Sequence, residues 1–474
     1  MRRFLLLILL LPALSGITLP ASCQTKRPFT FDDMMKLKRV GEPVPSPDGR
    51  WVLFAAVDVD LAANKKTSHI WIVPLGATNP DKKSVTAGDS AGPQSSNDTT
   101  KEHMLISDQD GDRPRWAPDG KHFAFLSNKE GGSQIWIGDF DSTTGTVSAV
   151  HKFTAIATET GGELWSPDSK TILFTSDVYP ECDGAPDAEA TCNEKRMKEV
   201  ADSKVKAIVF DRLLYRHWTS YKRGMRSHIF VVAAPDFSKN EKVVLTPVTS
   251  ARDLTPGDFD SPQFSLGGQD NYAFSPDGQE VCYTSNHDKV EAISTNNDLW
   301  LVPISVGAGD SPVQAKNITA DNPASDSTPL YSPDGKYIAY RAQKRPGYES
   351  DRFRLMLYDR KTKERKDLTE NFDRWVATVA WAPNSKDIYF SAEHEGVAPI
   401  YHTTVGERNG PCARINGRQV EAKRETSFVH AHLCNAESRY SRFQSGYAPA
   451  AQRTEVLQPS FGFAVGVGVG PGWS

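Results

Sequence analysis

Apolar and polar residues alternate in short runs along most of this chain, in the pattern of half-buried β-strands. Runs such as HFAF (122–125) and YIAY (337–340) each follow a turn segment close to Ser-Pro-Asp-Gly. Proline presets φ at the second position of a type I turn, and Asp and Gly suit the third and fourth positions. Each such unit therefore predicts a β-hairpin.

Copies of this turn and strand recur at 44–56, 115–127, 164–176, 273–285, 330–342 and 380–392. Their prolines are spaced by 71, 49, 109, 57 and 50 residues. A base period near 50 residues, with room for about four strands, is typical of a β-propeller blade. We therefore expect an all-β fold: a β-propeller with about six recognisable blades, the last of them incomplete.

The longest spacing contains an insertion at 177–227, called the insert below. Its middle predicts a short helix over 195–207. Cys182 and Cys192 lie ten residues apart in its acidic, polar first part, where a disulfide would restrain a loop with little core of its own. The sequence leaves two alternatives: a Cys182–Cys192 disulfide, or two unpaired thiols at these positions.

The N-terminus predicts export. Two arginines precede an apolar run from Phe4 to Leu19, and small residues follow. This is the pattern of a signal peptide, assigned to 1–23. The competing interpretation is a signal anchor, but the run is short for a membrane span and contains Pro12. We expect no transmembrane span after the signal peptide is removed, and a periplasmic or extracellular location. Whether Cys23 is lipidated is left open.

Composition and charge narrow the possible partners. The net charge is only −4, which gives no electrostatic reason to expect nucleic acid as a partner. No paired CxxC motif is present. We expect no metal and no cofactor. Cys282 stands at an alternating strand position and is interpreted as a buried core residue, whereas His69, His217, His228 and His287 are interpreted as packing or surface histidines.

Residues 406–474 follow a different pattern. They contain no Asp, and seven Arg stand against one Lys. The repeat is also missing from this segment. We interpret it as a disordered or out-of-frame tail, with a divergent but genuine linker as the alternative. The predicted propeller accordingly covers 28–405.

Three stretches resemble one family of proteins beyond the repeat itself, at 209–218 (VFDRLLYRHW), 253–278 and 340–360. They resemble the N-terminal propeller of the prolyl oligopeptidase family of serine peptidases, in its acylaminoacyl-peptidase and dipeptidyl-peptidase branch. The resemblance covers about residues 28–405. It implies a substrate-gating propeller that partners a separate α/β-hydrolase domain carrying the catalytic Ser, Asp and His.

A hydrolase domain needs roughly 200–250 residues, and only 69 follow Val405, so this domain is expected to be absent. Residues 88–92 read GDSAG, which matches the pattern around many nucleophilic serines. A nucleophile elbow needs a buried strand before the serine and a helix after it. The flanking residues are polar, so Ser90 is assigned to a loop between blades. No catalytic residue is therefore predicted, and whether the chain is an enzyme stays open.

The resemblance implies peptides as partners and the propeller part of a secreted serine exopeptidase-like protein, inactive alone. The alternative is a TolB-like periplasmic propeller that binds a protein partner. Two arginines, an aspartate and two aromatic residues crowd 211–218. Asp211, Arg212, Tyr215 and Arg216 are therefore candidate substrate-facing residues, because arginine pairs with carboxylates and acids hold amino groups. The competing interpretation is that this segment only packs against a blade.

Overall fold

The computed structural model describes residues 27–75, 101–217, 219–237, 245–265, 268–304, 314–406 and 413–414. Contacts divide the chain into two compact units, residues 1–39 with 58–66 and residues 40–57 with 67–474. The predicted signal peptide and Ser90 lie outside the described residues, as does the tail apart from residues 406, 413 and 414.

The smaller unit contains helix α2 (Phe31–Lys36). Thr30 and Asp33 form a reciprocal cap, since the Asp33 backbone N–H donates to the Thr30 hydroxyl and the Thr30 N–H donates to the Asp33 carboxylate. Arg27 pairs with the same carboxylate at 2.5 Å. These contacts fix the first turn of a helix that has no buried residues.

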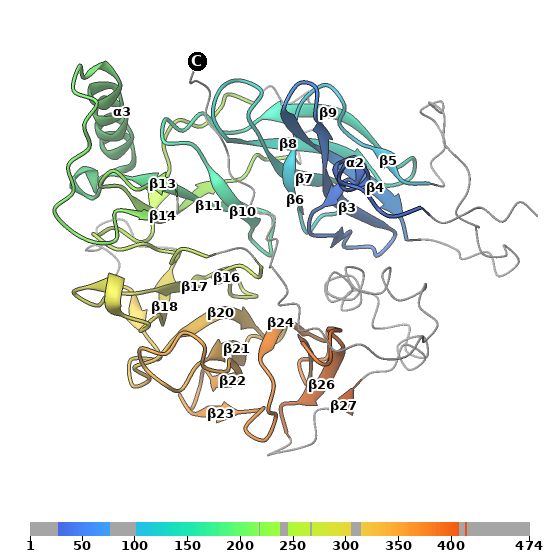
Figure 1. Ribbon diagram of the computed structural model, residues 1–474, viewed down its shortest axis with the longest axis vertical. Helices are drawn as coiled ribbons and strands as arrows, with labels where there is room; N and C mark the ends of the chain where they lie inside the picture. Colours follow the sequence, from blue (N-terminus) through green and yellow to red (C-terminus); the bar gives the residue numbers. More distant parts are fainter. Residues whose placement is uncertain are drawn as a thin grey trace, which may run out of the picture. The chain divides into compact units, whose positions relative to one another are not determined.

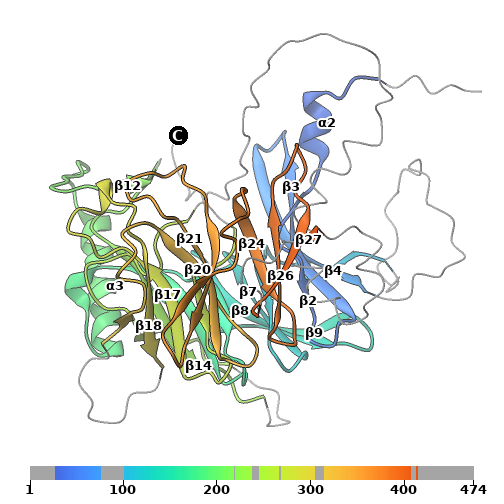
Figure 2. The same cartoon turned by 90° about the horizontal axis from the view of Figure 1, so that it is seen from below.

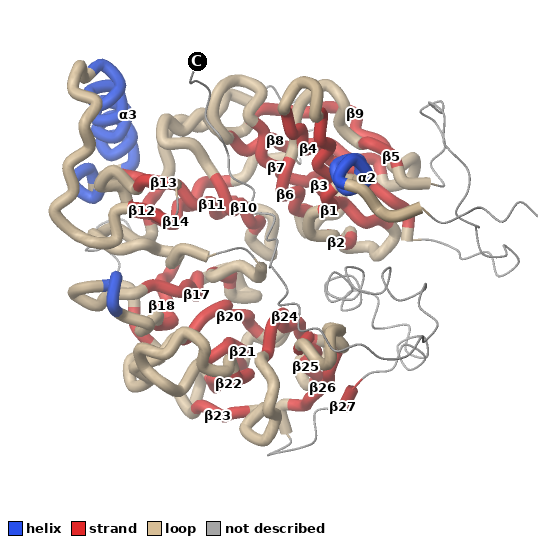
Figure 3. Tube along the Cα trace, in the orientation of Figure 1, coloured by secondary structure: helices blue, strands red, loops and turns tan. Residues whose placement is uncertain are grey.

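The described chain is mostly β with few helices (Figures 1 and 3). Its first strands are β1 (Arg39–Val40), β2 (Val44–Pro45), β3 (Trp51–Asp60), β4 (Lys65–Pro74) and β5 (His103–Met104). Five four-stranded antiparallel sheets follow among the described residues of the larger unit, each with its strands in chain order. The first two contain β6 (Asp112–Trp116), β7 (His122–Ser127), β8 (Gln134–Asp141) and β9 (Thr146–Lys152), then β10 (Gly161–Trp165), β11 (Thr171–Val178), β14 (Arg226–Ala233) and β15 (Arg252–Asp253).

The remaining sheets contain β16 (Tyr272–Phe274), β17 (Glu280–Ser285), β18 (Asp298–Pro303) and β19 (Lys316–Asn317); β20 (Asp326–Tyr331), β21 (Tyr337–Ala342), β22 (Arg354–Asp359) and β23 (Arg365–Asp367); and β24 (Val376–Trp381), β25 (Asp387–Ala392), β26 (Ile400–Thr404) and β27 (Ala413–Arg414). The last sheet, expected to be incomplete, has four strands because β27 pairs with β26. Figure 2 shows β17, β18 and β20 side by side.

Successive sheets pack against each other through the two faces of their strands. On β11, Ile172 and Phe174 pack against residues of β7 and β8, whereas Leu173 packs against β16 and β17. On β17, Val281 packs toward β14, whereas Cys282 packs toward β21. Because side chains alternate across a strand, one run of apolar residues supplies two cores. The expectation that Cys282 is a buried core residue is confirmed.

The repeated turns share one hydrogen-bond pattern. The hydroxyls of Ser46, Ser166, Ser275 and Ser332 each donate to the aspartate two residues later, at 2.5–2.7 Å. The same hydroxyls accept from the backbone N–H five residues after them, at the start of the next strand. The residue at the fourth position has positive φ, as at Gly49 (68°) and Gly335 (70°). Glycine adopts this conformation without steric cost.

The chain between β11 and β14 contains η1 (Pro180–Cys182), α3 (Pro186–Asp202), β12 (Arg216–His217) and β13 (Ser220–Tyr221). The helix predicted over 195–207 in fact begins at Pro186 and ends at Asp202. Pro186 stands in the first turn, where its missing N–H costs nothing, and Asp187 and Glu189 favour the positive end of the helix dipole. Among the described residues, no helix is long and apolar enough to cross a membrane. A short η2 (Glu291–Ile293) follows β17.

His287 is a packing histidine. Its ring stacks on Phe259 and Trp300, with centroids 3.8 and 4.0 Å apart. Its buried Nε2 has no hydrogen-bond partner in the described part of the chain. Burial lowers the pKa of His287 to about 4, from an ordinary value near 6.5.

This pKa predicts a pH dependence of stability. Between pH 6.5 and about 4 the unfolded chain protonates this ring and the folded chain does not, so acid in this window destabilises the fold. His287→Phe keeps an aromatic ring in the stack but has no group that titrates. As the pH falls from 7 to 4, we expect the free energy of unfolding of this variant to rise by about 1–3 kcal/mol relative to that of the wild type. Urea unfolding at a series of pH values measures this. A constant difference between the two proteins across that range would contradict the assignment.

Candidate functional site

The insert is anchored at both ends to neighbouring strands. It leaves β11 after Val178 and returns at Arg226, the first residue of β14, and these two residues are register partners. A disulfide joins Cys182 of η1 to Cys192 of α3. The bond closes a ten-residue separation and holds the start of the helix against the segment that leads into it.

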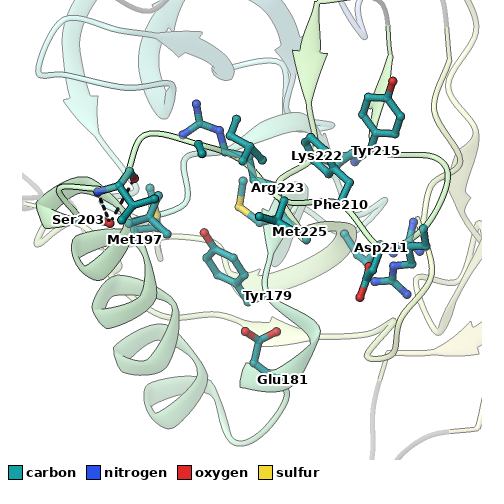
Figure 4. Close-up of a pocket in the computed structure, with 18 of the residues that line it drawn as sticks. Tyr179, Glu181, Met197, Ser203, Phe210, Asp211, Tyr215, Lys222, Arg223 and Met225 are labelled. Carbon is teal, nitrogen blue, oxygen red and sulfur yellow. Dashed lines mark hydrogen bonds between the residues drawn. The ribbon is translucent and has the colours of Figure 1, made fainter.

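A cavity of about 1060 Å³ lies between the helix and the remainder of the insert (Figure 4). Aromatic and methionine side chains supply part of its lining, and charged residues supply another part. The lining includes Tyr179, Glu181, Met197, Phe210, Asp211, Arg212, Leu214, Tyr215, Lys222, Arg223, Met225 and Arg226. Such a mixture of apolar surface and a few charges suits a ligand with apolar side chains and charged or polar backbone groups.

Three of the four candidate residues line this cavity, namely Asp211, Arg212 and Tyr215. Asp211 is exposed and forms no ion pair within the described residues. The Tyr215 ring packs beside Phe210, with centroids 4.6 Å apart. Arg216 lies on β12, with its guanidinium 5.9 Å from the Tyr215 ring, and is not among the lining residues.

Arg212 is engaged within the protein. It forms an ion pair with Asp258, in which both terminal nitrogens of the guanidinium donate to the carboxylate. The hydrogen bonds that Arg212 donates to Asp258 raise the pKa of Arg212 above its ordinary value. Arg212 therefore ties the insert to residue 258 of the β15–β16 connection, so a role in binding a substrate carboxylate would have to compete with this pair.

Arg226 is the buried centre of this charged network. Its side chain contacts Asp258 at 2.9 Å, Glu291 at 2.7 Å and Asp260 at 3.4 Å. Arg226 is 7% exposed. Burial acts to lower the pKa of Arg226, but the hydrogen bonds with Asp258 and Glu291 outweigh it and the pKa is raised. The charge is therefore retained, and the base of the insert is held by three carboxylates.

Lys222 separates the large cavity from a second one. Its ammonium group lies 2.9 Å from Asp260 and 3.4 Å from Asp177. Burial acts to lower the pKa of Lys222, and the two carboxylates raise it above its ordinary value. Lys222 lines both cavities, so its charge faces each of them.

The second cavity has a volume of about 400 Å³, and Arg113, Asp270 and His217 are among the residues that line it. Arg113 contacts both carboxylate oxygens of Asp270, at 2.8 and 2.9 Å. Its Nε lies 3.6 Å from the fully buried Glu163, whose pKa burial raises to about 8. On another side His217 stacks on Phe264, with centroids 3.9 Å apart, and burial lowers the pKa of His217.

Sequence reasoning did not identify Lys222, Arg226 or Arg113 as members of a site. The pairing of Arg113 with Asp270 spans 157 residues of sequence, so no local pattern contains it. Lys222 and Arg226 follow the candidate residues of 211–218 within ten residues. The closely spaced basic residues in this part of the sequence were the signal that could have identified them. A cluster that could hold a metal ion lies apart from both cavity linings and is formed by Asp183, Glu189, His228 and Asp253.

Curated proteins with similar sequences belong to the branch of peptidases that the sequence motifs resemble. No family model matches the chain. It is 29% identical over 396 residues to dipeptidyl-peptidase 5 of Porphyromonas gingivalis, covering 82% of this chain and 50% of that protein. It is 24% identical to a probable dipeptidyl-peptidase 5 of Arthroderma benhamiae, covering 79% and 48%. The chain thus spans about half the length of these curated relatives.

Solved structures with similar folds include Pyrococcus horikoshii acylaminoacyl peptidase, with a TM-score of 0.49 and 16% identity over 80% of this chain and 47% of that chain. Another is the β-propeller domain of the Trilobed protease from Pyrococcus furiosus, with a TM-score of 0.43 and 16% identity over 80% and 84%. The sequence relatives confirm the predicted resemblance to the prolyl oligopeptidase family of peptidases.

The network around Lys222 predicts a stability effect. Replacing Lys222 by Met leaves Asp177 without this partner and removes one cation from the buried Asp260. We expect a loss of about 3 kcal/mol in the free energy of unfolding, because one member of a largely buried pair is left uncompensated. Lys204→Met, at an exposed position of the same insert, should change stability by less than about 0.5 kcal/mol. Equal effects of the two substitutions, measured by urea unfolding, would disprove the role assigned to Lys222.

Proposed function

We propose that the chain is the substrate-gating propeller part of an exported serine exopeptidase-like protein, and that its insert contacts the peptide. The observation that carries this proposal is the match to dipeptidyl-peptidase 5 over 396 residues, which covers about half of the relative. The propeller has six blades, an assignment supported by the succession of sheets that pack through shared cores. A crystal structure of the chain tests this count.

The large cavity receives the amino-terminal end of the peptide. Asp211 supplies a carboxylate that is exposed to the cavity and forms no ion pair within the described residues. Tyr215, Phe210 and Met225 supply apolar surface for the first side chains of the peptide. A carboxylate accepting hydrogen bonds from an ammonium group gives both affinity and selectivity for a free amino terminus.

The basic residues of the cavity have a different role. Arg212 and Arg226 are held by Asp258 and position the segment that carries Asp211. Arg223 is exposed, lines the cavity and forms no ion pair within the described residues. It is the cation placed to meet a carboxylate of the peptide.

Peptide titration tests the role of Asp211. A tetrapeptide with apolar side chains and a free amino terminus should bind Asp211→Asn at least about fivefold more weakly than the wild type, because one charge-assisted hydrogen bond is lost. The N-acetylated form should bind both proteins equally. Glu194→Gln removes the same charge from an exposed position on α3 and should change neither affinity.

Identical dissociation constants for wild type and Asp211→Asn with the free peptide would contradict this assignment. Absence of peptide binding by the wild type, together with capture of a folded protein partner, would favour the TolB-like alternative instead. Fluorescence anisotropy with a labelled carboxyl terminus measures both affinities without blocking the amino group.

Export and inactivity are tested together by expressing the full chain with its own N-terminus. The apolar run from Phe4 to Leu19 supports cleavage near residue 23 and release from the cytoplasm. N-terminal sequencing of the exported chain should begin after that region, and the purified chain should not react with a fluorophosphonate probe. A chain that retains Met1, or labelling that Ser90→Ala abolishes, would contradict the proposal.

A further inference from the structure

Four side chains that could bind a metal ion converge where the first part of the insert meets strands β14 and β15. Asp183 follows η1, Glu189 lies on α3, His228 on β14 and Asp253 on β15. Each offers one ligand atom, and these atoms all lie within 4.8 Å of one another. They belong to neither cavity of the candidate peptide site: none of the four lines the cavities that share Lys222.

The hydrogen bonds of His228 fix which nitrogen faces the acids. Its ring is fully buried, and Nε2 lies 2.8 Å from the Gly257 carbonyl oxygen. A carbonyl only accepts, so Nε2 carries a proton and donates. Nδ1 then faces the acids: it shares a hydrogen bond with Asp253 Oδ2 at 2.6 Å, whose proton a metal ion would displace, and it lies 4.0 Å from Asp183 Oδ1. A backbone carbonyl that holds the far nitrogen of a histidine is the usual arrangement around a metal-binding imidazole.

Glu189 provides an independent indication that something is bound. It is 2% exposed, and neither oxygen of its carboxylate has a hydrogen-bond partner among the residues that the structure describes. Burying an ionised carboxylate without a partner costs several kcal/mol. This carboxylate is aimed at the other three groups, since its oxygen is within 4.8 Å of each of their ligand atoms.

The local charge is also unbalanced. Three carboxylates surround a single imidazole, and no lysine or arginine forms an ion pair with any of the four residues in the part of the chain that the structure describes. Burial requires that such a concentration of negative charge be compensated. A divalent cation supplies that compensation together with the missing contacts of Glu189.

We propose that Asp183, Glu189, His228 and Asp253 form a binding site for one divalent transition-metal ion of the Zn²⁺ or Mn²⁺ type. One imidazole and three carboxylates match the ligand preferences of these ions, whereas Cys182 and Cys192 are joined to each other and supply no thiolate. Neighbouring ligand atoms of such an ion are about 3.4 Å apart in a tetrahedral site. His228 Nδ1 and Asp253 Oδ2 are only 2.6 Å apart, so the Asp253 side chain moves away from His228 when the ion binds.

The position of the site suggests what the ion does for the protein. Cys182 immediately precedes Asp183, and Cys192 follows Glu189 by less than one helical turn, so the disulfide holds two ligand segments together. The other two ligands lie on paired strands. An ion shared by all four fixes α3 to the sheet, and Met197, Val200 and Ala201 of the same helix line the large cavity. Asp183, with 27% of its side chain exposed, marks the entry path.

Metal titration of the purified full chain tests the proposal. After dialysis against a chelator, calorimetry with Zn²⁺ and with Mn²⁺ should show one saturable site per chain for at least one ion. That ion should raise Tm progressively, with the logarithm of its free concentration once this exceeds Kd. Failure of both ions to bind the wild type would overturn the proposal, whatever the outcome of peptide titration.

Matched variants identify the ligands. Glu189→Gln should weaken binding at least about tenfold, since even changes outside the ligand shell of a metal commonly cost about 10–100-fold. Glu194→Gln, on the same helix but exposed, should bind as the wild type does. Unchanged affinity in Glu189→Gln would overturn the assignment. The wild-type titration keeps the test decisive if a variant fails to fold.

Discussion

The candidate site depends on the ion pairs of the buried Arg226 guanidinium. Arg226 is the first residue of β14, where the insert joins the sheet. Its guanidinium contacts the carboxylates of Asp258, Asp260 and Glu291. Asp258 in turn binds Arg212, so the position of the cavity lining is set by a residue of the sheet. Removing this charge would leave several carboxylates close together and partly desolvated, which a folded chain does not tolerate.

The sheets and the insert are stabilised by different interactions. Strands such as β11 supply two cores, with Leu173 and Phe174 on opposite faces, which makes the sheets a rigid base. The insert has few buried side chains of its own and relies on the Cys182–Cys192 disulfide and on ion pairs instead. A recognition segment held at several points by a rigid base can present side chains to a ligand with little loss of entropy.

Local patterns in the sequence predicted the strands and the repeated turns, because the Ser46 and Ser332 hydroxyls act within five residues. They also marked the segment of Asp211 and Tyr215, three of whose four candidates line the cavity. The start of α3 was placed too late, since Pro186 and the acids after it were read as loop. The convergence of Glu189 with His228, and of Arg113 with Asp270, depends on strand packing across long separations, which no local pattern encodes.

Hydrogen exchange of the full chain, with and without a peptide that has a free amino terminus, distinguishes an insert that contacts the peptide from sheets that only support it. We expect slower exchange on peptide addition in 205–212 and 222–225, two segments of the insert that line the large cavity, with the strands of the sheets unchanged. Unchanged exchange in both segments at a saturating peptide concentration, or protection confined to the strands, would contradict a role of the insert in peptide binding.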